Sequence, residues 1–110
     1  MRSFNKELRI FRGKHVTKEL VKDIIYRIEK TLRDEDSTIQ KVSVYSIHNP
    51  QPPNITLYFV ISSVDYPADR HMRFPLLDNP DFTAHFLNET EQMTQAQLDE
   101  YQLVDYQFPA

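Results

Sequence analysis

The longest amphipathic pattern in the sequence predicts a helix from Thr17 to about Arg33. Its apolar residues recur at intervals of three and four, which places them on one face of a helix. These residues are Leu20, Val21, Ile24, Ile25, Ile28 and Leu32. Thr17 has the side-chain oxygen of a good N-cap, and the acidic residues 34–36 mark the exit. We therefore expect one main helix that packs its apolar face against a core.

Two segments after this helix have patterns typical of β-strands. Residues 39–47 are rich in β-branched and aromatic side chains, and residues 54–64 are apolar on both alternating faces. A strand with two apolar faces suits the interior of a sheet, so we expect the second strand to be central. The prolines between the segments cannot donate to a ladder of hydrogen bonds. We therefore predict a hairpin with a stiff loop.

The remaining segments give weaker patterns. We expect a folded loop over residues 65–80, a short helix capped at Asn79–Pro80 that extends to Leu87, and a helical turn after a capping box at residues 94–97. Strand-like composition returns at residues 101–108, and residues 8–11 can supply another short strand.

Together these elements predict a single α+β domain over residues 1–110. Its antiparallel sheet packs the main amphipathic helix on one face. The finer expectation is the ferredoxin-like order β-α-β-β-α-β.

The composition excludes several kinds of chemistry. The 110 residues include one glycine, Gly13, and no cysteine. Phosphate-binding loops, dinucleotide fingerprints and nucleophile elbows need glycine, because the backbone takes positive φ or approaches a ligand closely. Without cysteine there is no disulfide or thiolate metal site, and the four histidines are too widely spaced for a helical zinc pair. We therefore predict no metal and no cofactor.

The location of the protein follows from two further features of the sequence. Its longest apolar run, around residues 58–61, is far shorter than the ~20 residues that cross a bilayer. The N-terminal residues have no apolar segment of the kind found in secretory signals. With the absence of cysteine, these features predict a cytoplasmic protein that does not associate with membranes.

The charges are unevenly distributed along the sequence. Residues 1–41 carry a net charge of +4 and residues 42–110 carry −7. Nucleic acid is one candidate partner for the basic half, although an ordinary solvated helix face is the simpler interpretation. Alternatively, the two halves complement each other between copies or toward another protein. The candidate basic face of the helix comprises Lys18, Lys22, Arg27 and Arg33.

The loop after the second strand carries polar groups suited to ligand binding. Arg70 can bind a carboxylate or phosphate through two hydrogen bonds, and His71 can exchange protons near neutral pH. Asp69 can orient a histidine tautomer. The simpler interpretation is a surface turn with a solvated Arg70. The candidate ligand-binding residues are Asp65, Tyr66, Asp69, Arg70 and His71.

An apolar stretch downstream is a candidate interaction surface. It either docks another chain or closes over one side of the core. Its residues are Phe74, Leu76, Leu77, Phe82 and Phe86.

The absence of catalytic signatures favours a non-enzymatic interaction or regulatory protein, with self-association as a homodimer the leading expectation. The first alternative is a small enzyme or ligand-binding domain that uses the loop from Asp65 to His71. The second is nucleic-acid binding through the basic helix face.

Overall fold

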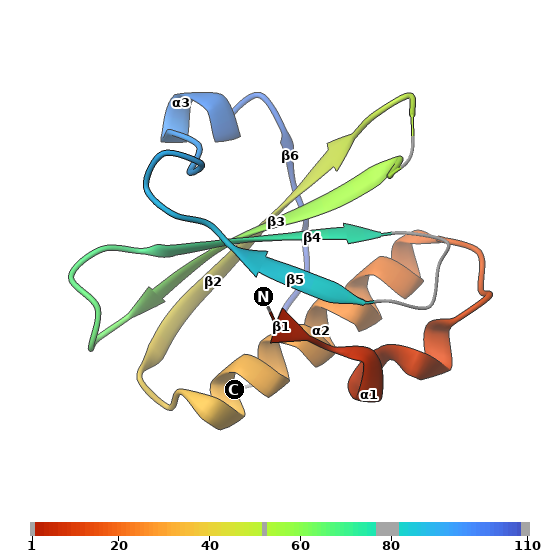
Figure 1. Ribbon diagram of the computed structural model, residues 1–110, viewed down its shortest axis with the longest axis horizontal. Coiled ribbons are helices and arrows are strands. Elements are labelled where there is room, and N and C mark those ends of the chain that lie inside the picture. Colours follow the sequence, from red (N-terminus) through yellow and green to blue (C-terminus); the bar gives the residue numbers. More distant parts are fainter. Residues whose placement is uncertain (1, 52, 77–81, 109–110) are drawn as a thin grey trace.

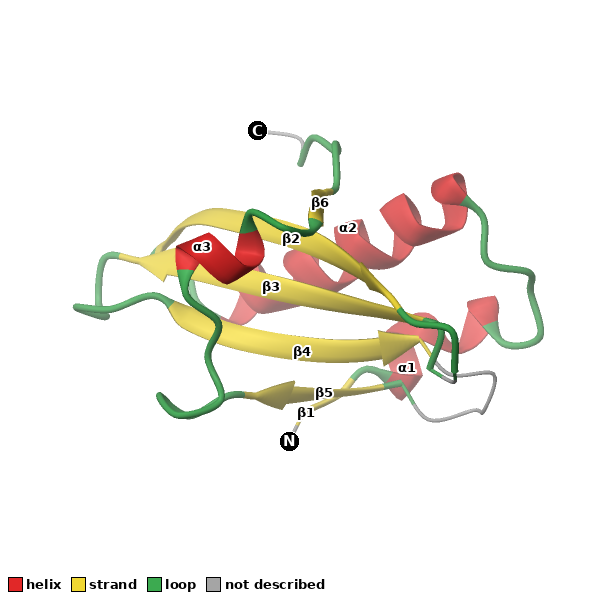
Figure 2. Ribbon diagram, turned by 90° about the horizontal axis from the view of Figure 1, so that it is seen from above, coloured by secondary structure: helices red, strands yellow, loops and turns green. Residues whose placement is uncertain are grey.

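The fold is an α+β arrangement in which a six-stranded antiparallel sheet packs one long helix on one face (Figures 1 and 2). The computed structural model describes residues 2–51, 53–76 and 82–108. The strands are β1 (Arg2–Ser3), β2 (Ile39–His48), β3 (Ile55–Ser63), β4 (Arg70–Leu76), β5 (Thr83–Phe86) and β6 (Gln102–Leu103). The helices are α1 (Asn5–Leu8), the 3-10 turn η1 (Arg9–Phe11), α2 (Lys18–Glu35) and α3 (Gln95–Leu98). The predicted fold class is confirmed.

Helix α2 forms where the amphipathic pattern predicts it. The Leu20 N–H donates to the Thr17 side chain over 3.1 Å, so Thr17 is the N-cap. Ile24, Ile25 and Ile28 are buried against the sheet. The helix ends at Glu35, two residues beyond the predicted end. In the ranges that the structure describes, no helix has the length and apolar character needed to span a membrane.

The strand order is β1-β5-β4-β3-β2-β6, which confirms that β3 is central. The antiparallel register places Val44 of β2 opposite Phe59 of β3, and Phe59 opposite Met72 of β4. All three side chains are fully buried on the face toward α2. Side chains on one face of a sheet alternate with those on the other, so Tyr58 points to the second face.

The second face is covered in part by the segment that follows β5. Leu87 and Leu98 are buried there together with Ile47 and Tyr58. Figure 1 shows α3 on the opposite side of the sheet from α2. The predicted capping box of α3 is present, with side-chain and backbone hydrogen bonds exchanged across residues 94–97. The sheet therefore contacts apolar side chains on both faces.

The chain leaves β6 at the edge of the sheet and crosses to α2. The Val104 N–H donates to the Val44 carbonyl over 2.8 Å, and the Tyr106 O–H donates to Glu29. Glu29 is buried and also accepts from Arg33 Nε over 2.8 Å. Burial and the adjacent Glu29 carboxylate raise the pKa of Tyr106. A buried carboxylate needs such donors, so the C-terminal segment completes the environment of Glu29.

Three finer predictions of secondary structure are wrong, each because tertiary packing selected another conformation. Residues 8–11 are helical, since Phe4, Leu8 and Phe11 reach the core at helical spacing. Residues 70–76 form a strand instead of a loop, and residues 83–86 form a strand instead of a helix. The proposed cap at Asn79–Pro80 lies outside the described residues. Of residues 101–108, only Gln102–Leu103 form a strand.

The ferredoxin-like order is not confirmed. Strands β2 to β5 follow one another along the chain, with each paired to the next in antiparallel orientation. In a ferredoxin-like arrangement, the second helix comes between two main strands along the chain. Here α3 follows β5, and the only strand after it in the chain is the two-residue β6. The fold is thus a meander of strands with α2 on one face.

Candidate functional site

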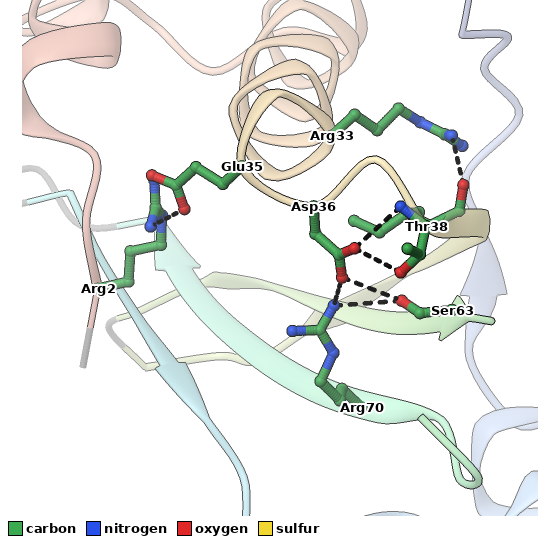
Figure 3. Close-up of polar contacts among 8 residues, drawn as sticks. Arg2, Arg33, Glu35, Asp36, Thr38, Ser63 and Arg70 are labelled. Carbon is green, nitrogen blue, oxygen red and sulfur yellow. Dashed lines mark hydrogen bonds and ion pairs between the residues drawn. The ribbon is translucent and has the colours of Figure 1, made fainter. Parts of the chain in front are cut away.

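Arg70 lies at the start of β4, and its guanidinium points into a polar corner between the end of α2 and the sheet (Figure 3). Its Nη2 donates to Asp36 Oδ2 over 2.8 Å and to Ser63 Oγ over 3.3 Å. Asp36 also accepts from the Thr38 N–H over 3.0 Å. Hydrogen bonds from Thr38, with the charge of Arg70 as a further cause, lower the pKa of Asp36. The charge of Arg70 is therefore balanced within the fold.

Two exposed aromatic rings flank Arg70. Its guanidinium carbon lies 4.2 Å from the centre of the Tyr66 ring and 5.9 Å from that of Phe86. Tyr66 is 47% exposed and Phe86 41%. We call Tyr66, Arg70 and Phe86 the aromatic patch. It combines two of the candidate ligand-binding residues with one residue of the candidate interaction surface.

His71 belongs to a different cluster, on the second face of the sheet. Its Nδ1 lies 2.6 Å from the Tyr58 hydroxyl, which accepts from the Met93 N–H over 2.9 Å. The hydroxyl and the imidazole share this hydrogen bond, and the histidine tautomer sets which of them is the donor. Burial lowers the pKa of His71, with Asp69 opposing the shift, and burial raises the pKa of Tyr58. The cluster holds the segment around Met93 on the sheet.

The predicted ligand loop is therefore divided between the two faces of β4. Adjacent residues of a strand point to opposite sides, which separates Arg70 from His71. Asp65 and Asp69 are exposed in the connection before β4. The loop supplies part of a surface, and its five candidate residues do not converge on one ligand.

The predicted apolar interaction surface is also divided. Phe74 is fully buried and Phe82 is 6% exposed, and their rings stack with centroids 6.5 Å apart. These two side chains close the core and cannot contact a partner. Leu76 is partly buried against the same core, and Leu77 lies outside the described residues. Phe86 is the member of this set whose ring is exposed.

The basic face of α2 is interrupted. Arg33 donates to Glu29 and to the Ile39 carbonyl, and the Arg27 guanidinium lies 5.3 Å from the centre of the Phe11 ring. The remaining candidates, Lys18 and Lys22, are exposed on the first turns of the helix. The four cations therefore do not present one phosphate-binding stripe.

Exposed cations also precede α2. We call Arg9, Arg12 and Lys14 the basic end; within the described part of the chain none of them forms an ion pair. Arg12 and Lys14 border the same hollow as Leu20 in the first turn of α2, whereas Arg70 of the aromatic patch contacts Asp36 at the C-cap of α2. Figure 1 shows the segment before α2 and the turn between β3 and β4 at opposite ends of this helix. Ile10 and Val16, which are 51% and 45% exposed, accompany the basic end.

A pocket of about 460 Å³ opens between the first turns of α2 and the β2–β6 side of the sheet. Val21, Ile55 and Val104 line it, and Ser46 Oγ lies 2.7 Å from His48 Nε2 at its border. A serine nucleophile needs a base held by a third group and donors for the oxyanion. Among the described residues, no carboxylate is hydrogen-bonded to His48. The pocket was not predicted from the sequence because its lining comes from four separate segments, at residues 16–22, 46–48, 55 and 102–105.

Within the described residues, no group of three or more side chains is arranged to hold a metal ion. Comparisons with protein-family models, curated proteins and solved structures gave no significant match. The class that the fold defines is an α+β domain, and any function must be argued from its surfaces.

Proposed function

We propose that the protein is a non-enzymatic interaction protein that self-associates head to tail, with the aromatic patch of one copy against the basic end of the next. One observation carries this proposal. Exposed aromatic rings beside acidic residues lie near the end of α2, and exposed cations with apolar neighbours lie beside its start. One copy therefore carries two surfaces of complementary character.

The composition of the aromatic patch suits a protein interface. Tyrosine and arginine are enriched among the residues that contribute most to binding energy. Arg70 is held by Asp36 and stacks on Tyr66, so little side-chain freedom remains to be lost on association. Such preorganisation reduces the entropic cost of binding.

Electrostatics favour contact between unlike ends. Asp65 and Asp69 border the aromatic patch, and the C-terminal end of α2 adds partial negative charge. The basic end has the opposite charge and lies beside the N-terminus of α2. If two copies met through the aromatic patch, the acidic residues beside it would repel each other, whereas opposite ends attract.

A head-to-tail contact differs from the expected homodimer in its symmetry. Each copy keeps one unused surface, so association continues into chains or closes into rings. We therefore refine the expected homodimer to a head-to-tail oligomer. We place it in the cytoplasm, because a chain without cysteine suits a reducing compartment.

Light scattering coupled to size-exclusion chromatography tests this proposal over a tenfold range of concentration. The 13.1 kDa chain should show a mass above the monomer that rises with concentration at low salt. High salt should reduce it, because the screening length falls from about 30 Å at 0.01 M to about 3 Å at 1 M. A monomer at every concentration, or association that strengthens with salt, would contradict the proposal.

Mixing two variants distinguishes head-to-tail from symmetric contact. Tyr66→Ser/Phe86→Ser removes the patch, and Arg12→Glu/Lys14→Glu reverses the basic end. Each variant alone should be monomeric, and their mixture should stop at a heterodimer, because one intact surface remains on each partner. Leu103→Ser and Lys41→Glu are controls at exposed positions outside both surfaces. If each variant still self-associates fully, the assigned surfaces are wrong.

A further inference from the structure

We propose that the pocket between α2 and β2 binds a small organic anion with an apolar body, of the monocarboxylate class. Lys18, Lys22 and Val104 line it, together with residues of β2 and β3. Its lining contains no residue of the aromatic patch and none of the three cations of the basic end. It shares only Val16, an apolar neighbour of the basic end, with the surfaces proposed for self-association.

The walls of the pocket are apolar and anchored. Val21 of α2, Ile55 of β3 and Val104 after β6 are partly buried and pack against the main core. The backbone at Val104 is fixed by its hydrogen bond to Val44. A volume of about 460 Å³ is within the range of about 300–1,000 Å³ found for small-molecule sites. The pocket can therefore take an apolar group without refolding.

The border of the pocket is predominantly basic. Lys18 and Lys22 lie one turn apart on α2, and neither forms an ion pair within the described ranges. Exposed His48 stands on β2, and Asp105 is the opposing carboxylate at the border. The N-terminal turn of α2 adds partial positive charge. One negative charge on a ligand is thus favoured at the border.

The combination of walls and border selects the ligand class. A neutral apolar molecule would leave both lysines without a partner. A compact, multiply charged phosphate would leave the apolar walls in water, which forfeits the hydrophobic contribution to binding. A monocarboxylate with an alkyl or aryl body satisfies both, because its charge stays at the exposed lysines while its body contacts Val21, Ile55 and Val104.

Amide chemical shifts during titration with octanoate test the inference. We expect saturable shifts at Val21, Ile55 and Val104, weaker binding of octanol and no binding of acetate. The Tyr66→Ser/Phe86→Ser variant serves as the host protein, so that failure of self-association and failure of ligand binding are observed separately. No saturable shift at millimolar octanoate, or equal affinity for octanol, would overturn the inference.

Two variants examine the two parts of the pocket. Lys18→Gln/Lys22→Gln should weaken octanoate binding by roughly two- to fivefold per lysine, as expected for exposed ion pairs, and should leave octanol binding unchanged. Lys30→Gln, on the same helix outside the pocket, is the matched control. Val104→Phe should fill the cavity and abolish binding while the circular dichroism spectrum is retained. Unchanged binding in both pocket variants would refute the site.

Discussion

Replacing Tyr58 with phenylalanine would remove one hydroxyl from beneath the segment that covers the second face of the sheet. The ring is 1% exposed and keeps its packing in the variant. The hydroxyl accepts from the Met93 N–H over 2.9 Å and shares a hydrogen bond of 2.6 Å with His71 Nδ1. The substitution therefore deletes two hydrogen bonds and leaves the apolar contacts in place.

The expected loss of stability follows from these two bonds. Each hydrogen bond contributes about 1 kcal/mol net, and a buried group left unpaired costs about 1–3 kcal/mol. His71 and Met93 are only partly buried, so water can replace part of the hydrogen bonding that these two groups lose with the hydroxyl. We expect a loss of about 2 kcal/mol, or about 8 °C in Tm at about 4 °C per kcal/mol for a domain of this size.

Urea unfolding followed by circular dichroism measures this loss, and hydrogen exchange reports where it acts. The Met93 amide should exchange faster in the variant, because its acceptor is gone. Tyr45→Phe is the matched control on the same face, since its hydroxyl has only a long contact of 3.4 Å with Gln95, and it should change stability by less than about 0.5 kcal/mol. A Tyr58→Phe loss as small as the control's, with unchanged exchange at Met93, would refute the reasoning.

Two further predictions concern His71 and Gly13. Burial lowers the pKa of His71 in the folded state, so the unfolded chain takes up this proton at a higher pH than the folded chain does. The contribution of His71 to the free energy of unfolding should therefore be complete above about pH 6.5 and should be lost as the pH decreases through the folded-state pKa. Urea midpoints should show this decrease in the native protein and a smaller one in His71→Asn, which cannot titrate; equal decreases would assign it to other groups. Gly13 has φ of 75°, with no atom within 4 Å of an added Cβ. Gly13→Ala should therefore cost about 1–2 kcal/mol of unfolding free energy through the backbone alone, and an unchanged urea midpoint would contradict that cause.

The elements predicted well are those with long periodic patterns. The stripe of α2 and the two apolar faces of β3 repeat over many residues, so local irregularities do not obscure them. Thr17 and Thr94 were recognisable as caps because an N-cap depends on neighbours within three residues. Their hydrogen bonds are present at both helices.

Strand β4 escaped prediction because a proline hides its alternation. Met72 and Phe74 are buried on one face, in the pattern of a strand, but Pro75 suggests a loop. The structure tolerates this residue near the end of β4, because among the described residues Met72 and Arg73 are the positions of β4 that pair with β5. The proline is thus compatible with the sheet for a reason that only its neighbours in space reveal.

The main helix and the central hairpin were predictable from the sequence, because they depend on residue type and on neighbours along the chain. Which polar groups meet depends instead on how the strands pair and pack in space. Arg70 reaches Asp36 across 34 residues, and His71 reaches Tyr58 on the opposite face of β4. Strand register sets such partners, since a slip of one residue would turn each side chain to the other face of the sheet.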